Sequence, residues 1–337
     1  MTLSLTTASA LTGPSSFCQT WKFAPSKLLN LAIDEDSSNS IRQVHGALFS
    51  RVSPTPLKST ELVAVSEDAV RHVLGLSIHD IIGDAQFVEF VNGACQPANA
   101  ALLAHCYGGH QFGVWADQLG DGRALLLGET AHPQRYELAL KGSGKTPFSR
   151  RGDGRAVVRS SVRELLASEA MHFLGVPTSR AIAMIQSRSE LATRDQFYNG
   201  QLSREPTAIV LRAAPTWFRF GSFELPARRG DVNVLRELAD FVITHHFPSI
   251  AARTSGASAE CNCLPTVTLA ERYSSLFREV VNSTALLMAH WQSVGFAHGV
   301  CNTDNYSILG ITIGEACRQH SSTNVVVFRF WSVPLLG

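Results

Sequence analysis

The sequence has no uninterrupted run of about 18 apolar residues, the length that a membrane-spanning helix needs. It also has almost no net charge, because 29 lysine and arginine residues stand against 28 aspartate and glutamate residues. A balanced chain has no overall electrostatic attraction to nucleic acid or to an anionic membrane. We therefore expect neither as a partner, and any phosphate chemistry must come from local basic clusters.

No two cysteines stand at the C-x-x-C spacing that is typical of zinc sites and thioredoxin-type redox sites. The cysteines are odd in number and scattered, and disulfides are rare in reducing compartments. We therefore expect reduced, buried thiols. The seven residues are Cys18, Cys95, Cys106, Cys261, Cys263, Cys301 and Cys317.

The first 33 residues contain no acidic residue, are rich in serine and threonine, and carry Lys22 and Lys27. This composition resembles a mitochondrial presequence, although the usual arginines are missing. Two interpretations of residues 1–40 stay open. They are a transit peptide, which predicts a mitochondrial location, or a disordered tail, which leaves a cytoplasmic one.

The composition of the remaining chain is that of a globular protein, with 45% hydrophobic and 17% charged residues among 337. Apolar periodicity predicts helices over 66–76, 160–174 and 269–294, and the start of another in 99–105. Strands are predicted over 124–128 and 135–140 as part of a small β-rich lobe. Residues 251–262 are predicted to be a loop, and 324–331 is a short β-prone run.

A phosphate-binding loop of the Walker A type is disfavoured. The residues GSGKT at 142–146 resemble one, but the motif needs a glycine at position 139, where this chain has Ala139.

Lys141 and Glu164 match a different phosphate-binding arrangement. In kinase-like folds, a lysine at the end of a strand pairs with a glutamate on the following helix, and the pair fixes the ammonium against phosphate oxygens. A plainer alternative also stays open, because Glu164 stands at capping-box spacing from Ser161 and Lys141 can be a solvated strand end.

Asp304 and Asn305 lie directly after the predicted helix 269–294, in HGVCNTDN at 298–305. The carboxylate can orient an attacking hydroxyl, and the amide oxygen can bind Mg²⁺. An Asp-Asn pair after a helix is also a common turn, so the two interpretations are about evenly balanced.

Six ordered motifs together resemble the selenoprotein O family over about residues 42–313. They are YGGHQFG at 107–113, LGDGRA at 119–124, KGSGKTPFSR at 141–150, GDGRA at 152–156, RSSVRE at 159–164 and HGVCNTDN at 298–305. The resemblance implies an α+β, protein-kinase-like fold of two lobes. ATP is bound flipped in this family, and AMP is transferred to Ser, Thr or Tyr hydroxyls of proteins.

The resemblance also implies a division of the chain and a set of site residues. Residues 41–215 would form the nucleotide-binding N-lobe, and 216–313 an incomplete helical catalytic lobe. Asp304 would be the catalytic base, Asn305 a Mg²⁺ ligand and Glu164 the ion-pair partner of Lys141. The nucleotide-binding residues would be Gly120, Gly122, Arg123, Lys141, Asp153, Gly154, Arg204 and Arg212.

The chain departs from the family after Ile313. Where the family has an Asp-Tyr-Gly segment with the second metal ligand, this sequence has Gly314, and Glu315 is one position late for the same face of an extended chain. We therefore expect 314–337 to be a tail foreign to the family, and a truncated protein with weak or no transfer activity. The alternatives are a nucleotide-binding protein without catalysis and, less favoured, an ordinary protein kinase.

Overall fold

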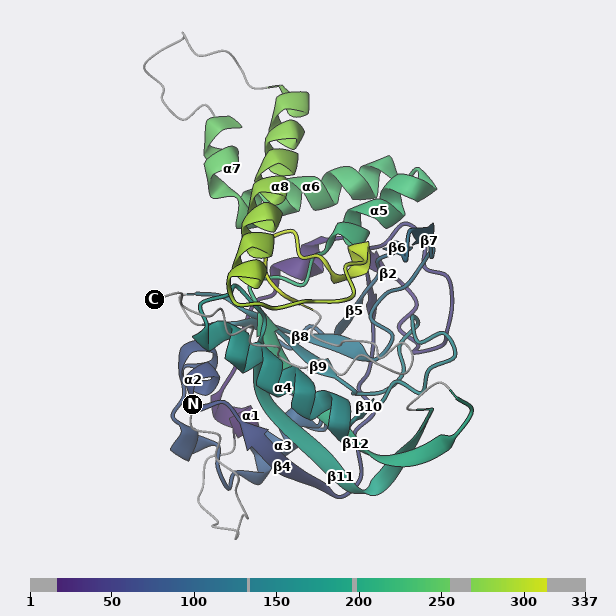
Figure 1. The fold of residues 1–337 in the computed structure, drawn as a ribbon, viewed down its shortest axis with the longest axis vertical. Coiled ribbons are helices and arrows are strands. Elements are labelled where there is room, and N and C mark those ends of the chain that lie inside the picture. Colours follow the sequence, from purple (N-terminus) through teal and green to yellow (C-terminus); the bar gives the residue numbers. More distant parts are fainter. Residues whose placement is uncertain (1–16, 132–133, 196–198, 255–267, 314–337) are drawn as a thin grey trace, which may run out of the picture.

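The computed structural model describes residues 17–131, 134–195, 199–254 and 268–313. Within them, ten strands form one large sheet (Figure 1). These are β1 (Phe23–Ala24), β2 (Ile33–Asp34), β3 (Phe49–Arg51), β4 (Thr60–Val65), β5 (Leu103–His105), β8 (Ala124–Thr130), β9 (Glu137–Lys141), β10 (Ala156–Val157), β11 (Arg180–Asp195) and β12 (Leu202–Ala214).

Eight of these strands follow the order β2-β3-β5-β8-β9-β12-β11-β4, while β1 pairs with β8 and β10 with β12. The pairings are antiparallel except for β2 with β3. A second, two-stranded sheet consists of β6 (His110–Gln111) and β7 (Val114–Trp115).

Eight α-helices and four further short helical turns accompany the sheets in the described residues. The helices are α1 (Phe17–Thr20), α2 (Glu67–Ala69), α3 (Ala85–Val91), α4 (Val158–Phe173), α5 (Phe220–Arg229), α6 (Val232–His246), α7 (Pro248–Thr254) and α8 (Leu269–Ser293). The turns are η1 (Lys27–Asn30), η2 (Val70–Leu74), η3 (Ile78–Asp80) and η4 (Thr303–Asn305). This mixture confirms the predicted α+β class.

Both faces of the sheet are covered, and β12 shows how its residues are divided between them. Ile209 and Leu211 pack into the core shared with η2 and α3, whereas Ala208 and Val210 pack with Leu165 of α4. Figure 1 shows α4 lying across β11 and β12, with α5 to α8 gathered at one end of the sheet. The predicted lobe boundary at 215/216 lies between β12 and α5.

Three predicted elements are confirmed with small shifts at their ends: the strand 124–128 as β8, the helix 160–174 as α4 and the helix 269–294 as α8. The strand 135–140 is also present, as β9, and the helix 66–76 as α2 followed by η2. The predicted loop 251–262 is wrong over 251–254, which belong to α7, and the rest of it lies outside the described residues.

Two predictions fail because tertiary contacts override local pattern. A helix beginning in 99–105 is wrong, since Leu103–His105 is the buried strand β5 between β3 and β8. A disordered tail over 1–40 is wrong from Phe17 onward, because Phe17, Phe23 and Leu28 are buried in the core. Residues 1–16 and 314–337, and with them the β-prone run 324–331, lie outside the described residues.

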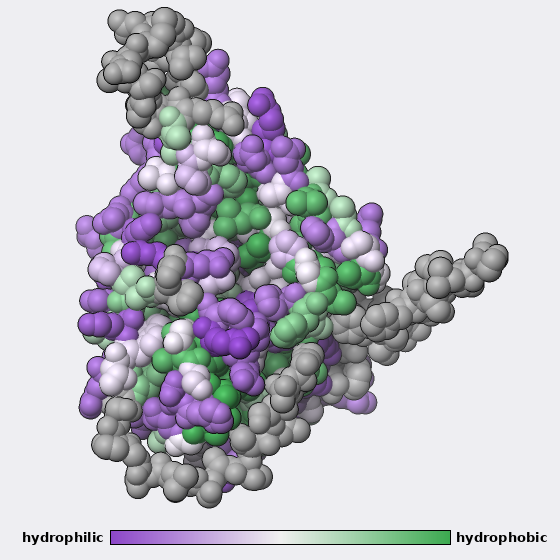
Figure 2. All heavy atoms as spheres, turned by 90° about the vertical axis from the view of Figure 1, so that its left-hand side faces the viewer, coloured by the Kyte–Doolittle hydropathy of each residue, from purple (hydrophilic) through white to green (hydrophobic). Residues whose placement is uncertain are grey.

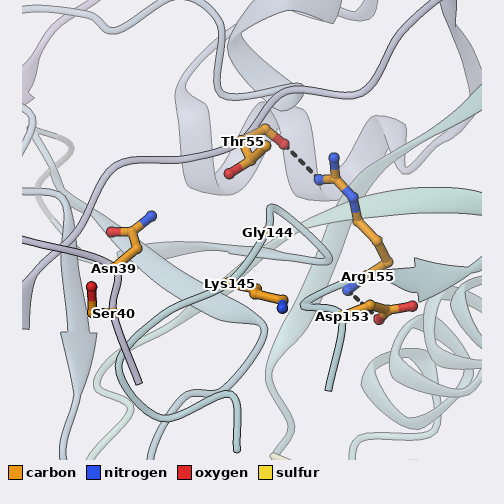
Figure 3. Close-up of a pocket in the computed structure, with 7 residues that line it drawn as sticks. All are labelled: Asn39, Ser40, Thr55, Gly144, Lys145, Asp153 and Arg155. Carbon is orange, nitrogen blue, oxygen red and sulfur yellow. Dashed lines mark hydrogen bonds between the residues drawn. The ribbon is translucent and has the colours of Figure 1, made fainter. Parts of the chain in front are cut away.

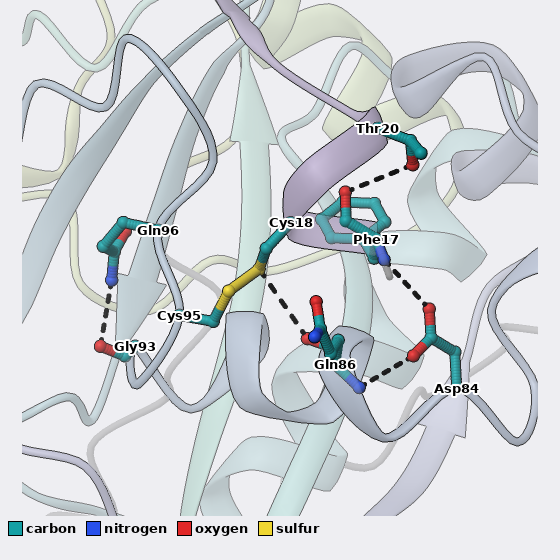
Figure 4. The surroundings of a disulfide bond; sticks show 8 residues. All are labelled: Phe17, Cys18, Thr20, Asp84, Gln86, Gly93, Cys95 and Gln96. Carbon is teal, nitrogen blue, oxygen red and sulfur yellow. Dashed lines mark hydrogen bonds between the residues drawn. A yellow bond between two sulfur atoms is a disulfide. The ribbon is translucent and has the colours of Figure 1, made fainter. Parts of the chain in front are cut away.

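Cys18 and Cys95 form a disulfide, which corrects the expectation of reduced thiols for this pair. The bond joins α1 to the turn after α3 (Figure 4). Nearby, Phe17 of α1 packs against Phe87 of α3. Cys106 is a buried free thiol, and burial raises its pKa to about 12. Cys301 is also free but exposed, and the remaining cysteines lie outside the described residues.

Polar areas and apolar patches alternate on the face that carries α7, α8 and α2 (Figure 2). Helix α8 buries Leu276, Leu287 and Trp291 but exposes Phe277 and Leu286. In the described part of the chain, no helix combines the length and the apolar character that crossing a membrane requires.

A buried ionic cluster attaches α4 to the sheet. Arg180 of β11 donates from Nε to Oε1 of Glu169 at 2.8 Å and from Nη2 to Oε2 at 2.7 Å, and it also reaches Asp68 at 2.9 Å. Ser66 donates to the same Glu169 carboxylate. The Arg180 and Glu169 side chains are only 7% and 2% exposed. Each charge is therefore stabilised by the other rather than by water.

We expect Arg180→Ala to lower the free energy of unfolding by about 3–5 kcal/mol, because it leaves the Glu169 carboxylate buried without its cation. The measurement is urea unfolding followed by circular dichroism. Arg188→Ala is the matched control, since Arg188 pairs with Glu61 in a largely exposed position and should leave the midpoint unchanged. Equal midpoints for the two variants would contradict this account of α4 docking.

Candidate active site

Lys141, Glu164 and Arg212 form a compact ionic triad between the sheet and α4. Lys141 Nζ lies 2.5 Å from Glu164 Oε2, and Arg212 Nε lies 2.7 Å from Glu164 Oε1. Lys141 pairs in register with Val210 on β12, so Arg212, two residues further, projects from the same face of the sheet. The side chain of Lys141 is 17% exposed, that of Glu164 is 6% exposed and that of Arg212 is 8% exposed.

The alternative role for Glu164, in a capping box with Ser161, is wrong. Helix α4 begins at Val158 with Val157 as its N-cap, so Glu164 lies in the second turn and faces the sheet. Its carboxylate is committed to the two cations instead. Burial raises the pKa of Glu164, but the charges of Arg212 and Lys141 outweigh it and lower the pKa to about 2.

The triad leaves an excess of positive charge at neutral pH, because two cations share one carboxylate. Burial lowers the pKa of Lys141 to about 8, against the raising effect of Glu164, and the nearby charge of Arg123 also lowers it. Arg123 immediately precedes β8, whose first residue Ala124 pairs with Lys141. The sequence prediction that these residues lie together therefore agrees with their placement.

Arg212 is held from several sides and cannot swing freely. Its Nη2 donates to Ser179 Oγ at 2.8 Å and to the carbonyl oxygen of Ile313 at 2.9 Å. Its guanidinium also lies 4.7 Å from the ring centre of Trp217, a cation–π contact. Trp217 itself is fixed through hydrogen bonds to Glu137. The cation next to Glu164 is thus preorganised.

Gly120 and Gly122 form a turn that packs against the loop after β9. A Cβ on Gly120 would lie 2.3 Å from Phe148 Cγ, and one on Gly122 would lie 2.6 Å from the carbonyl oxygen of Phe148. Gly120 also has a φ of +66°. The absence of a side chain at both positions is therefore required for close packing of the turn on the loop.

Asp153 and Gly154 lie in the same loop, on the side of a separate open pocket of about 490 Å³ (Figure 3). Lys145, Arg155, Asp153, Gly144 and Thr55 line this pocket together with Asn39 and Ser40. Asp153 accepts two hydrogen bonds from Arg194, at 2.7 and 3.0 Å. The lining of this pocket includes neither Lys141 nor Asp304.

Arg204 is not brought to the triad. It lies on the exposed outer part of β12, six residues before Val210, the register partner of Lys141. At about 3.3 Å per residue its Cα stands about 20 Å from that position along the strand. The predicted grouping of Arg204 with Lys141 and Arg212 is therefore not what the strand geometry provides.

Asp304 and Asn305 form the turn η4 after α8, and residues far away in sequence hold it. Gln111 Nε2 donates to Asp304 Oδ2 at 3.1 Å, and Arg219 Nη1 donates to the carbonyl oxygen of Asp304 at 2.9 Å. Asn305 Nδ2 donates to the carbonyl oxygen of Val300 at 3.1 Å, which leaves its Oδ1 as the acceptor atom. The turn is a constrained element rather than a solvated one.

Arg219 links this turn to the glycine turn. Its Nη2 lies 3.9 Å from Asp121 Oδ1, and its guanidinium lies 4.3 Å from the ring centre of Tyr107. Burial raises the pKa of Asp121 above its ordinary value, although the charges of Arg219 and Arg212 act in the opposite direction. A path of charges thus runs from the triad through Asp121 and Arg219 to Asp304. No sequence pattern pointed to Arg219, whereas Tyr107 belongs to the motif at 107–113, for which no role was predicted.

A sequence profile described as Protein adenylyltransferase SelO matches residues 33–314 of this chain. The chain belongs to the SelO family. It is 48% identical over 285 residues to the Protein nucleotidyltransferase YdiU of Azoarcus sp. (strain BH72), covering 84% of this chain and 51% of that protein. The YdiU protein of Nitrosospira multiformis is 48% identical over 282 residues, with coverages of 83% and 47%.

The chain spans about half the length of the curated relatives it matches, with 51% and 47% of those two proteins covered. A third relative, the YdiU protein of Xanthomonas euvesicatoria pv. vesicatoria, is 48% identical over 274 residues and covered to 49%. Family membership confirms the resemblance and agrees with the kinase-like, α+β fold. The mitochondrial location expected from the first 33 residues stays a prediction.

The triad predicts an acid-dependent stability for this SelO chain. The pKa of Glu164 is about 2 in the folded protein against 4.5 ordinarily, so its stabilisation is complete above about pH 4.5 and is lost as the pH falls to about 2. We expect Glu164→Gln to lower the free energy of unfolding by about 3 kcal/mol at neutral pH. The difference between the variant and the wild type should disappear as the pH falls from about 4.5 to about 2. The measurement is chemical unfolding at a series of pH values.

Glu67→Gln is the control for this experiment, because Glu67 is an exposed residue of α2. It should follow the wild-type stability at every pH. A Glu164→Gln variant whose deficit stayed constant down to pH 2 would show that the lost stability does not come from the ionised carboxylate.

Proposed function

We propose that this chain is the nucleotide-binding part of a protein adenylyltransferase, which transfers AMP from ATP to hydroxyl groups of protein substrates. One observation carries the proposal: a buried carboxylate, Glu164, holds Lys141 and Arg212 side by side with a net positive charge. Such a pair of fixed cations is suited to a polyphosphate, because no reorganisation is needed when the anion arrives. The names of the SelO family and of the YdiU relatives support the reaction type.

In this proposal the triphosphate of ATP lies against Lys141 and Arg212, with Arg123 at the rim of the site. Arginine offers a planar fork of donors for phosphate oxygens, while the lysine ammonium acts as a compact charge. Glu164 keeps both cations in place and stays ionised because its pKa is about 2. Other parts of the nucleotide are proposed to contact Asp153, Gly154, Gly120 and Gly122. Arg204 is proposed to reach the nucleotide only if its part of β12 changes position.

The proposed transfer step uses Asp304 as the general base. The oxygen of a Ser, Thr or Tyr hydroxyl attacks the α-phosphorus, a bond between that oxygen and phosphorus forms, and the bond from phosphorus to the bridging oxygen of pyrophosphate breaks. The hydroxyl proton passes to the Asp304 carboxylate, and pyrophosphate leaves with the bonding electrons. Positioning and charge neutralisation supply most of the acceleration in such reactions.

The described residues provide little for a Mg²⁺ ion on their own. Asn305 Oδ1 is oriented as an acceptor, but no group of three or more His, Cys, Asp or Glu side chains in the described part of the chain is arranged to hold a metal. Mg²⁺ is commonly held by one or two protein oxygens together with substrate phosphates. We therefore assign Asn305 as a contributing ligand and derive no step through the metal.

The sparse metal site favours a second candidate function, the binding of nucleotide without transfer. Gly314 stands where the family resemblance expects the second metal ligand. In this alternative, the triad retains its affinity for ATP while transfer is lost. The two candidates make different predictions for label transfer but the same prediction for binding.

The labelling experiment incubates the full chain with ATP labelled on either the α- or the γ-phosphate, in the presence of Mg²⁺ and a protein extract. Adenylyl transfer leaves the α-label on protein and the γ-label in pyrophosphate, and Asp304→Asn should lower α-labelling by about 100-fold or more. An ordinary kinase would instead retain the γ-label. No label of either kind, with ATP still bound, supports the nucleotide-binding candidate.

ATP binding should weaken as the pH rises through about 8, because Lys141, with a pKa of about 8, loses its positive charge. We expect Lys141→Met to weaken binding by at least about tenfold at pH 7 and to flatten the dependence on pH. Isothermal titration calorimetry gives both results. Lys58→Met, an exposed change, is the control; a variant Lys141→Met that binds as tightly as this control would refute the role of the triad.

A further inference from the structure

Three consecutive residues at and beyond β6 contact residues 302–304, which are the N-cap and the first two residues of the turn η4. The backbone N–H of His110 donates to Thr303 Oγ1 at 2.8 Å, and that of Phe112 donates to Asn302 Oδ1 at 3.0 Å. Between them, the side chain of Gln111 donates to Asp304 at 3.1 Å. The outward edge of the β6–β7 hairpin thus contacts residues 302–304, although the two segments are about 190 residues apart in the sequence.

Glycines make this contact close. A Cβ on Gly109 would lie 2.6 Å from Thr303 Oγ1, and one on Gly221 would lie 2.0 Å from the carbonyl oxygen of Gly108. Any side chain at Gly109 or Gly221 would therefore push the hairpin away from the turn or from the start of α5. The hairpin is held at a fixed distance from Asp304 on both sides.

The two carboxylate oxygens of Asp304 have different surroundings. Oδ2 accepts the Gln111 hydrogen bond, whereas Oδ1 is buried and has no hydrogen-bond partner within the described residues. A buried carboxylate oxygen without a donor is unfavourable, so it favours an incoming O–H group. Gln111 thereby selects which oxygen is left for that group.

We propose that Gln111 is a positioning residue for Asp304: its amide holds Oδ2, so that Oδ1, which has no donor, is the oxygen left to take the proton of the substrate hydroxyl. This inference rests on the proposed function of Asp304. It assigns a role to the β6–β7 hairpin that is separate from nucleotide binding, since the hairpin contacts η4 and not the triad. The hairpin therefore acts on the rate of transfer and not on the affinity for ATP.

The charged and titratable groups around Asp304 come from three elements. Arg219, the N-cap of α5, donates to its carbonyl oxygen, and the Tyr107 hydroxyl interacts electrostatically with both Arg219 and Asp304. His110 Nδ1 lies 2.9 Å from Glu224 Oε1 of α5. A change of Gln111 to another neutral side chain leaves all of these groups in place, so its effect can be assigned to the amide donor.

The decisive variant is Gln111→Met, which keeps the length of the side chain and removes the donor. We expect kcat for adenylyl transfer to fall about tenfold to a hundredfold, the factor for one hydrogen bond to a charged group, with KM for ATP unchanged.

Two comparisons separate positioning from general damage. Val114 lies directly across the hairpin from Gln111, and its side chain is 69% exposed. Val114→Ala should therefore leave the rates unchanged. In the Asp304→Asn background, Gln111→Met should have no further effect, since it acts through Asp304. A tenfold additional loss there, or a change in KM for ATP without a change in kcat, overturns the proposal.

A readout without catalysis keeps this inference distinct from the proposed function. If the wild-type chain transfers neither label, the proposed function fails, and Gln111 is then judged by hydrogen exchange of peptides covering 299–306. Exchange several-fold faster in Gln111→Met than in both wild type and Val114→Ala supports the contact as the element that holds Asp304. Equal exchange in all three proteins overturns it.

Discussion

The Glu164 carboxylate lies between two cations from neighbouring strands, and much of the site depends on this interaction. Lys141 comes from the end of β9 and Arg212 from β12, so the two meet Glu164 only if α4 crosses the sheet at one position and one rotation. Ion pairs this buried are stable only when their geometry is good, because each charge has lost its hydration. The same requirement that places α4 therefore also fixes the spacing of the two cations.

Helix α4 is anchored twice along its length, with different consequences. In the Arg180–Glu169 cluster, near its C-terminal end, one cation donates hydrogen bonds to two carboxylates, those of Glu169 and Asp68. The Glu164 cluster, one and a half turns earlier, has an excess of positive charge instead. We interpret the first as an attachment that carries no ligand chemistry, and the second as a site whose electrostatics favour an anion. The contrast lies in charge balance rather than in burial, which both share.

Local sequence was a good guide where one strong pattern coincided with one structural role. The Lys141–Glu164 pair was predictable because a strand end and an amphipathic helix are both visible in the sequence. The hairpin of β11 and β12 was not predicted, since residues 208–214 are buried on both faces and lack the alternation of a half-exposed strand. The grouping of Arg204 with Lys141 and Arg212 was not a reliable prediction, because a family resemblance contains no information about distance. Each residue of an extended strand adds about 3.3 Å to the separation.

The position of the turn η4 could be predicted from sequence, but the residues that hold it could not. Asp304 follows a long helix and was found by position, whereas Gln111 and Arg219 meet it only in the folded chain, 193 and 85 residues away. Arg219 also approaches Asp121, whose charge responds to Arg212. Asp121 therefore lies between the charge of Arg212 and that of Arg219, and Arg219 holds the backbone of the turn through the carbonyl oxygen of Asp304. One buried guanidinium thus contacts both the glycine turn and the backbone of Asp304, while Gln111 contacts the Asp304 carboxylate alone.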